Sequence, residues 1–496
     1  MNLIKSKVKI LIALLLLGCA SAKGQDVERA PLDKPNIVFI LADDLAWADV
    51  AYNGHPFFET PNIDKFVKDG VNLDQMYSGG PNCMPTRACL ITGMYAPRTD
   101  VYTPGGESKG NKSYMRLAVP GTNDLGNSQF KSQKKGLSKR VTSVADVLNK
   151  AGYVTARIGK WHLGNDNLGF NESNLMGTSG SKGGFGNPIS SELLTKGGIK
   201  FIKENKDNPF FLYLPLWDVH GPLASTEKLI EKYEKKNERL GTDYDPEYAG
   251  MVEAVDITVN KIRETIENLG LSDNTIIIFS SDNGGAHYTS NAPLKGAKGG
   301  LYEGGIRVPS AVYWKGITKK GSVSNIPITS VDLLPTLTEL ARGTLPDSHP
   351  VDGASFVPVI KGIDDSHLVE RSIFWHYPLY LAGKNDEEKV YTVHGTDNYY
   401  FRGVPSSAIR KGKWKLLYYY ETKTYELFDI INDPYESNNL AKTDANKAKA
   451  LNDELQQWLI DTKAPQPSVL NPDFDSKAKD NTKKKSGKKK KKKKKK

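Results

Sequence analysis

The stretch NIVFILADD, residues 36–44, decides the fold class. Segment 36–41 is almost entirely apolar, which predicts a β-strand covered on both faces, as in a parallel sheet. The strand is followed by Asp43 and Asp44. Two adjacent carboxylates repel each other unless a cation lies between them, and their hard oxygen atoms suit Ca²⁺ or Mg²⁺. The pair therefore predicts a metal site at the end of a buried strand, with a turn or helix cap as the alternative.

Three further strands are predicted, and each also ends in polar residues. These strands are expected at 153–158, 210–216 and 275–279, and helical patterns lie at 61–67, 141–148, 193–205 and 248–269. Strands that alternate with helices predict an α/β fold with a doubly wound, mostly parallel sheet, in which ligands bind beyond the carboxyl ends of the strands. The polar residues after the four strands are Asp43, Asp44, Lys160, His162, His220, Asp282 and Asn283. Each one alone could cap a turn or make a structural hydrogen bond, but seven together predict a functional site.

The segment NCMPTRACLITGMYAPR, residues 82–98, predicts a short helix that starts at a cysteine. Pro85 suits the first turn of a helix, because its missing N–H would be unpaired there in any case. Cys83 would then lie at the helix N-terminus, where backbone donors and the helix dipole favour an anion. That position suits a nucleophile, whereas a small buried hydrophobic residue is the alternative and is the role we expect for Cys89.

The pattern changes near residue 345. Segments rich in aromatic and β-branched residues lie at 371–377, 408–419 and 425–429, and a helical pattern follows at 445–459. We therefore expect a catalytic domain over residues 33–345 and a smaller C-terminal subdomain, an antiparallel sheet with one helix, over residues 346–467. Segments 99–139 and 165–190 are predicted to be long loops, which are often functional.

The N-terminal residues 1–22 predict a signal peptide. Three lysines precede an apolar run at 10–17 that is too short to span a bilayer, and Ala20 and Ala22 form a small-x-small cleavage site. The protein is therefore expected to be exported, to the periplasm, the cell surface or the medium. Gly18-Cys19 resembles a lipobox, so a lipid tether through Cys19 and a released protein both remain open.

The C-terminal residues 468–496 predict a disordered tail that contains fourteen lysines. Such a tail is either attracted to polyanions or simply solvated. The two ends supply the net charge of +11, and the body is mildly acidic. A basic surface for nucleic acid is therefore not expected.

Five motifs resemble those of one enzyme family, the type I sulfatases. CMPTR at 83–87, followed by ACLITG, resembles the family signature C-x-P-S/T-R. The other similar segments are NIVFILADDLAWAD at 36–49, GKWHLG at 159–164, SDNGG at 281–285 and LKGAKGGLYEGGIRVP at 294–309. The resemblance covers residues 36 to about 309, with weaker similarity beyond. Thr86 stands where serine is commoner, and Ala46 and Ala48 stand where glycine is usual.

The resemblance implies an alkaline-phosphatase-like fold and a defined chemistry. A maturation enzyme would oxidise Cys83 to formylglycine, whose hydrated form attacks sulfur. One Ca²⁺ would be bound by Asp43, Asp44, Asp282, Asn283 and the modified Cys83. Arg87 and Lys160 would hold the nucleophile, His162 would accept a proton, His220 would protonate the leaving oxygen, and Lys298 would bind the sulfate.

Two C-terminal segments, 374–378 and 406–412, look like parts of bacterial sulfatases that act on carbohydrates. His376 is the predicted sugar contact, with a packed histidine in an aromatic cluster as the alternative. The expected function is an exported, calcium-dependent sulfatase of a sulfated polysaccharide, such as ulvan or a sulfated galactan. The alternatives are a phosphomonoester or phosphonate hydrolase of the same fold, and a non-catalytic glycan-binding lipoprotein.

Overall fold

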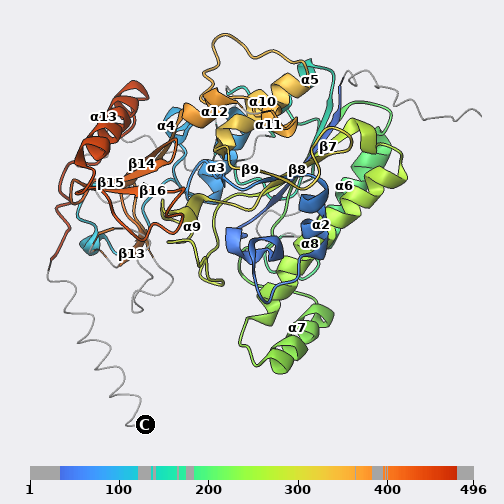
Figure 1. Ribbon diagram of the computed structural model, residues 1–496, viewed down its shortest axis with the longest axis horizontal. Coiled ribbons are helices and arrows are strands. Elements are labelled where there is room, and N and C mark those ends of the chain that lie inside the picture. Colours follow the sequence, from blue (N-terminus) through green and yellow to red (C-terminus); the bar gives the residue numbers. More distant parts are fainter. Residues whose placement is uncertain are drawn as a thin grey trace, which may run out of the picture. The chain divides into compact units, whose positions relative to one another are not determined.

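The computed structural model describes residues 34–120, 136–137, 141–164, 167–174, 184–363, 365–382, 395–396, 398 and 400–476 (Figure 1). The predicted signal peptide, Cys19 and the lysines from residue 477 onward lie outside these residues. The described residues after Asp33 form one compact unit. In this part of the chain, no helix is both long enough and apolar enough to cross a membrane.

An eight-stranded sheet forms the centre of the large domain, in the order β5-β4-β6-β1-β7-β8-β2-β9. Its strands are β1 (Asn36–Ala42), β2 (Val71–Leu73), β4 (Val154–Ile158), β5 (Glu172–Asn174), β6 (Phe210–Pro215), β7 (Thr275–Ser281), β8 (Ala311–Trp314) and β9 (Ser322–Ser324). The five strands from β5 to β7 run parallel, whereas β8 is antiparallel to both β7 and β2. The predicted doubly wound, mostly parallel sheet is confirmed.

Strand β1 is central in the sheet and fully buried, which explains its apolar sequence. Val38 and Ile40 pack on one face with residues of α2, α6 and α8, and Ile37 and Phe39 pack on the other with residues of α3, α5 and α10. These helices are α2 (Pro61–Asp69), α3 (Cys83–Thr92), α5 (Val144–Lys150), α6 (Ser190–Asn205), α8 (Pro246–Asn268) and α10 (Leu333–Leu340). Because helices cover both faces, alternate residues of the strand can all be apolar.

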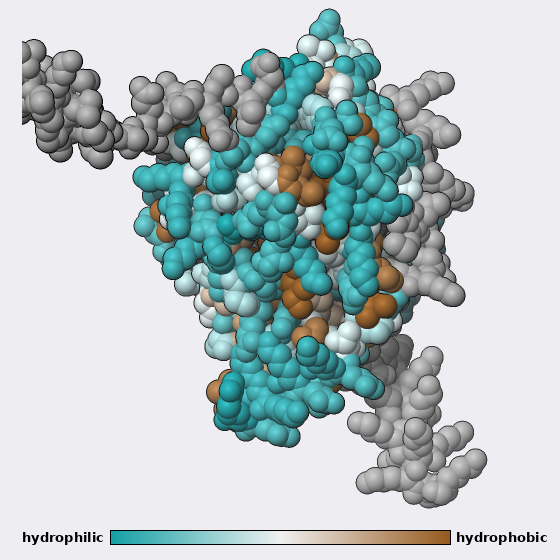
Figure 2. Space-filling model, turned by 90° about the vertical axis from the view of Figure 1, so that its right-hand side faces the viewer, coloured by the Kyte–Doolittle hydropathy of each residue, from teal (hydrophilic) through white to brown (hydrophobic). Residues whose placement is uncertain are grey.

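Helix α7 (Glu227–Leu240) is not predicted by the sequence pattern. Nine of its fourteen residues are charged and only Tyr233 is buried, so the helix lacks the broad apolar stripe of a helix that faces the core. The face of the molecule drawn in Figure 2 is mainly hydrophilic, with small separate hydrophobic areas. The shorter helices are α4 (Ala96–Thr99), α9 (Glu303–Ile306), α11 (Val357–Ile360) and α12 (Ser366–Glu370).

The C-terminal subdomain is the predicted antiparallel sheet with one helix. Its strands are β11 (Ser372–Tyr377), β14 (Ser406–Lys411), β15 (Trp414–Tyr419) and β16 (Thr424–Asp429), and α13 (Ala445–Asp461) packs against them. The segment 408–419, rich in aromatic and β-branched residues, lies in the β14–β15 hairpin, in which Gly412 turns the chain with a positive φ of 54°. Two further strand pairs join β3 (Met76–Tyr77) to β10 (Ile328–Thr329), and β12 (Leu381–Ala382) to β13 (Phe401–Gly403).

The predicted start of the disordered tail at residue 468 is wrong. Asn471 donates from Nδ2 to the carbonyls of Lys112 and Met115, and Ala118 N donates to Val469 O. Residues 468–476 contain no lysine, so this segment lacks the self-repulsion that predicted disorder for the rest of the tail.

A buried charge cluster joins the small sheet to the large domain. The Lys415 ammonium of β15 lies 2.9 Å from a carboxylate oxygen of Glu303 in α9 and 2.9 Å from one of Glu436. Arg410 of β14 donates to Tyr77 OH and Gln75 Oε1, close to the segment that leads to Cys83. The small sheet therefore fixes the segment before helix α3 in place.

Candidate active site

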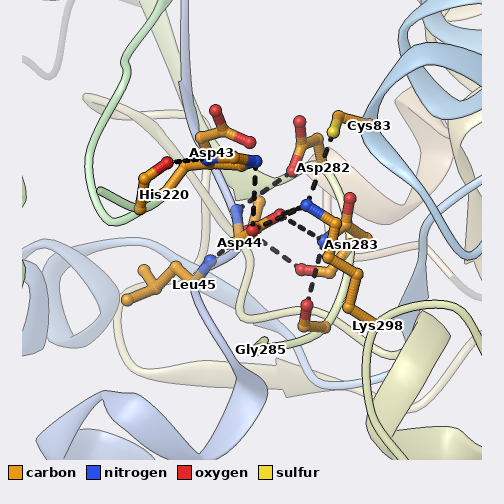
Figure 3. Close-up of polar contacts among 12 residues, drawn as sticks. Asp43, Asp44, Leu45, Cys83, His220, Asp282, Asn283, Gly285 and Lys298 are labelled. Atoms are coloured by element: carbon orange, nitrogen blue, oxygen red, sulfur yellow. Dashed lines mark hydrogen bonds and ion pairs between the residues drawn. The ribbon is translucent and has the colours of Figure 1, made fainter. Parts of the chain in front are cut away.

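The four strands with polar residues at their ends are neighbours in the sheet, in the order β4-β6-β1-β7. The residues after them therefore meet at one edge of the sheet, as predicted. Figure 3 shows those that follow β1, β6 and β7. Backbone hydrogen bonds fix the segment after β6 beside the segment after β1, because Asp43 N donates to Asp218 O and Val219 N donates to Asp43 O. The structure thus brings together the seven residues that the strand pattern singled out.

The carboxylates of the site are fully buried and are held close together. Asp44 N donates to Asp282 Oδ1 at 3.1 Å, and Asn283 Nδ2 donates to Asp44 Oδ1 at 2.7 Å. Asp43, Asp282 and Asn283 have no exposed surface, and Asp44 is 3% exposed. The pKa of Asp282 is raised to about 6, mainly by burial and secondly by the repulsion of the Asp43 carboxylate. Carboxylates that are buried this close together need positive charge nearby.

Three basic side chains supply that charge. Arg87 of α3 donates from Nε and Nη2 to Asp282 Oδ2, at 2.9 and 2.6 Å, and from Nη1 to Lys160 O. The Lys160 ammonium pairs with Asp43, and the Lys298 ammonium lies 2.6 Å from Asp44 Oδ2. Burial alone would lower the pKa of Lys298, but the Asp44 carboxylate overrides that effect and raises it. Each carboxylate therefore has at least one cation beside it, and Asp43 also lies 3.9 Å from Arg87 Nη2.

Cys83 opens α3, as predicted, with Asn82 as the N-cap residue. Its side chain is 2% exposed, and Sγ lies 3.6 Å from Lys298 Nζ. Burial raises the pKa of the thiol, although Lys160 and Lys298 oppose this effect. An unmodified Cys83 would therefore be mostly a neutral thiol, which is a poor nucleophile. In the structure, Sγ takes the place of the hydroxyl oxygens that a hydrated formylglycine would carry.

The other cysteine, Cys89, is fully buried and its Sγ lies 3.7 Å from Gly79 O. A Cβ at Gly79 would lie only 2.6 Å from Cys89 Cβ, so the residue packs tightly. Both described cysteines are free thiols. The prediction that Cys89 is a small buried residue is confirmed.

His220 lies at the outer side of the site, with 27% of its side chain exposed, and its Nε2 is 3.7 Å from Asp44 Oδ2. Nδ1 lies 2.6 Å from Gly221 O, so this nitrogen carries a hydrogen and Nε2 faces the site. Burial lowers the pKa of His220 to about 4, and Lys160 and Lys298 contribute to the shift. The negative charge of an anion bound in the site would raise this pKa again and favour the imidazolium.

His162 lies deeper than His220 and has a left-handed backbone with φ of 64°. Burial and the nearby Lys160 hold its pKa well below the usual range. Its buried Nδ1 has no hydrogen-bond partner in the described part of the chain. His162 is therefore a neutral imidazole that can accept a proton.

The donor set fits a hard divalent cation. Asp43 Oδ1 and Asn283 Oδ1 are both buried and lack a hydrogen-bond partner among the described residues. Ligand atoms of Asp43, Asp44, Cys83 and His220 all lie within 4.8 Å of one another. Both oxygens of Asp282 already accept hydrogen bonds but keep further lone pairs. Oxygen atoms from carboxylates and an amide are the ligands that Ca²⁺ prefers.

His376 does not lie in this site, which contradicts its predicted sugar contact. The residue is 4% exposed, and its ring nitrogens lie 2.8 Å from Ser407 Oγ and 2.9 Å from Pro465 O. Its ring makes edge contacts with Tyr102 and Tyr420. Since both nitrogens are engaged inside the protein, His376 is a packed residue of an aromatic cluster.

Sequence reasoning missed Asp218, which supports the segment that carries His220. Its carboxylate accepts hydrogen bonds from the hydroxyls of Ser190 and Ser191 at the start of α6. Burial raises its pKa to about 6. Its position at a strand end, two residues before His220, could have suggested a role in the site. Its partners Ser190 and Ser191 lie far away in the sequence, so the hydrogen bonds could not be predicted.

Comparison with known proteins agrees with this geometry. The family model "Sulfatase" matches residues 35–344, and the model "N-sulphoglucosamine sulphohydrolase, C-terminal" matches residues 297–464. A sulfatase of Formosa agariphila is 28% identical, over 92% of this chain and 94% of the relative. The N-acetylgalactosamine-6-sulfatase of Rattus norvegicus is 29% identical, over 73% of this chain and 72% of the relative.

The solved structure of Ps i-CgsB in complex with k-i-k-neocarrahexaose is similar to this chain, with a TM-score of 0.70 and 26% sequence identity. The match covers 88% of this chain and 95% of the Ps i-CgsB chain. Because the sulfatase model matches well over half of the chain, and because the matched part contains the cysteine motif and all four strand ends, the protein belongs to the type I sulfatase family and is a sulfuric ester hydrolase.

Proposed function

We propose that this protein is an exported, calcium-dependent sulfatase that removes sulfate esters from a sulfated polysaccharide or its oligosaccharides through a formylglycine formed from Cys83. The observation that carries the proposal is the position of Cys83, buried beside Lys298 and the carboxylates at the strand ends. A thiol whose pKa is raised by burial is unsuited to attack an ester itself. An oxidised side chain at the same position removes this difficulty.

Asp43, Asp44, Asp282 and Asn283 would hold the calcium ion. When bound, the ion would act as a Lewis acid that stabilises negative charge on the sulfate oxygens. The unpartnered oxygens of Asp43 and Asn283 support this assignment. Arg87 fixes Asp282, and Lys160 fixes Asp43, so the proposed ligands are already oriented.

The hydrated aldehyde of formylglycine would supply the nucleophilic oxygen, which the thiol of Cys83 cannot. Lys298 lies next to this position and would neutralise a sulfate oxygen. His220, at the outer side of the site, would donate a proton to the leaving alcohol oxygen. His162, neutral and buried, would accept a proton at the inner side.

The substrate class is proposed from the relatives. One is named for N-acetylgalactosamine 6-sulfate, and one was solved with a neocarrahexaose. Both names concern carbohydrates, so a sulfated glycan is the proposed substrate, with ulvan or a sulfated galactan as the expected polymer. The predicted signal peptide supports export to the periplasm, cell surface or medium, with or without a lipid tether at Cys19.

Two measurements test the proposal. Mass spectrometry of the peptide that contains Cys83, from a host with a formylglycine-generating maturation enzyme, should show the aldehyde. Turnover of 4-nitrophenyl sulfate should exceed that of 4-nitrophenyl phosphate and should fall when calcium is removed by a chelator. A free thiol in the fully active protein would contradict the nucleophile, a preference for phosphate would favour a phosphomonoester hydrolase, and no turnover of the matured protein would favour a glycan-binding protein.

A further inference from the structure

The C-terminal subdomain reaches the sulfate site through strand β13. A Cβ at Gly299 would lie 3.3 Å from Arg402 Cγ, and a Cβ at Gly403 would lie 2.4 Å from Gly299 O. Only glycines allow the two backbones to come this close. Gly299 directly follows Lys298, whose ammonium contacts Asp44 and Cys83 (Figure 3). The Arg402 side chain therefore starts beside the residue proposed to bind the scissile sulfate.

Arg402 has no acidic partner among the described residues. Its Nε is buried without a hydrogen-bond partner, whereas the side chain as a whole is only half-buried. Arg87, Arg263, Arg307 and Arg371 pair with carboxylates, whereas the buried Arg157 and Arg410 have no ion pair among the described residues and lie over the rings of Trp161 and Tyr77 instead. A guanidinium taken partly out of water without a partner costs free energy, which an anionic ligand would recover.

Three buried polar groups lie together beside Arg402. Tyr377 OH, Thr103 Oγ1 and Asn82 Nδ2 are buried near one another, and apart from one another they have no hydrogen-bond partner in the described part of the chain. Burial raises the pKa of Tyr377, and Thr103, Arg402 and Asn82 are near enough to oppose that shift. Asn82 directly precedes Cys83. A polar wall that is rich in hydrogen-bond donors therefore extends from the nucleophile position to Arg402.

We propose that Arg402 binds a second anionic group of the glycan, a sulfate ester or a uronate carboxylate, next to the scissile sulfate. This inference rests on the proposed function. The planar guanidinium matches the two oxygens of a sulfate or carboxylate and can bind them with parallel hydrogen bonds. The enzyme would then prefer a sugar unit with two anionic groups to one with a single sulfate.

Three variants test the proposal: Arg402→Gln, Arg402→Lys and, as the control, Arg239→Gln. Arg239 is an exposed arginine of α7, so its replacement by glutamine removes the same charge at the surface. The probes are 4-nitrophenyl sulfate, neocarrabiose with one sulfate, neocarrabiose with two sulfates, and an ulvan disaccharide that carries a uronate. For each probe, kcat and KM are measured, or the inhibition constant against 4-nitrophenyl sulfate where the probe is not hydrolysed.

Arg402→Gln should weaken the binding of at least one dianionic probe by about 10- to 100-fold, mainly through a higher KM. This factor corresponds to the usual contribution of a hydrogen bond to a charged group. Its kcat/KM for 4-nitrophenyl sulfate should stay within about twofold of the wild type, because that probe has no second anion. Arg402→Lys should recover part of the loss, since it keeps the charge but not the planar fork. Loss with the disulfated probe or with the uronate probe identifies the second anion.

An equal loss on all four probes would overturn the inference, because it would show a merely structural role. No loss on any probe, or failure of the wild type to bind either dianionic probe, would overturn it as well. A different result would contradict the proposed function itself: no hydrolysis of 4-nitrophenyl sulfate by the matured, calcium-loaded wild type. The control Arg239→Gln should match the wild type throughout.

Discussion

Replacing Lys298 by methionine tests the charge balance of the catalytic centre. The centre holds three cationic side chains against three carboxylates: Arg87, Lys160 and Lys298 against Asp43, Asp44 and Asp282. Lys298 is 6% exposed and its partner Asp44 is 3% exposed, so water screens neither charge. Methionine fills a similar volume without charge. The variant therefore leaves one negative charge in excess at a buried site.

The expected cost follows from this burial. Removal of one partner of a buried ion pair costs about 3–5 kcal/mol, because the remaining charge is left without compensation. At about 2 cal/mol/K of unfolding entropy per residue, a chain of this length loses roughly 1 °C of Tm per kcal/mol. We therefore expect Lys298→Met to melt roughly 3–5 °C below the wild type in EDTA.

Calcium should reverse this loss. The ion would bring two positive charges to Asp44 and its neighbours, so the variant should bind it more tightly than the wild type and gain more stability. Thermal melts in EDTA and in millimolar calcium at pH 8 measure the difference. Lys65→Met is the control, because Lys65 is 66% exposed and pairs with Asp69 at the surface. Equal melting of the two variants in EDTA, or an equal calcium shift in Lys298→Met and the wild type, would refute the reasoning.

Three more predictions concern proton transfer, the nucleophile and pH. His220→Ala should slow the hydrolysis of alkyl sulfates by roughly 10²- to 10⁴-fold. The hydrolysis of 4-nitrophenyl sulfate should change little, because its leaving group needs no proton. An equal loss of rate for both kinds of leaving group would contradict the role of His220 as proton donor. Cys83→Ala should abolish turnover yet retain binding of a sulfated substrate in calorimetry, because the cations remain; hydrolysis by this variant would exclude the proposed nucleophile. Burial raises the pKa of Glu436 from 4.5 to about 7 despite Lys415. Glu436 therefore loses its proton at a lower pH in the unfolded chain than in the folded protein, and the free energy of unfolding should fall as pH rises from about 4.5 to 7. Glu436→Gln should reduce that fall in urea denaturation at pH 5 and pH 8, and an unchanged pH dependence would count against it.

Much of the fold could be predicted from local patterns. Strand β1 is almost entirely apolar because it is covered on both faces, and its central place in the sheet brings Asp43 and Asp44 next to the residues that follow β6 and β7. Helix α5 starts at Val144, three residues after its predicted start, because Ser143 caps it through Asp146 N. These features depend on residues close together in the chain.

Other features depend on contacts between distant residues and could not be predicted. Strands β2, β8 and β9 are only three or four residues long, too short for a periodic pattern. His376 lies in an aromatic segment that suits a sugar contact, and only the positions of Ser407 and Pro465 show that its nitrogens are engaged. The unpaired state of Arg402 likewise has no signature in the sequence.

The burial of helix α3 has a consequence for the order of events in biosynthesis. Every residue from Cys83 to Thr92 is enclosed by the surrounding protein. In the finished molecule only 2% of Cys83 is exposed, so an enzyme that modified it there would have to reach deep into the enclosed site. We therefore expect the proposed oxidation to take place while the polypeptide is still unstructured, before the surrounding segments close over the sulfur.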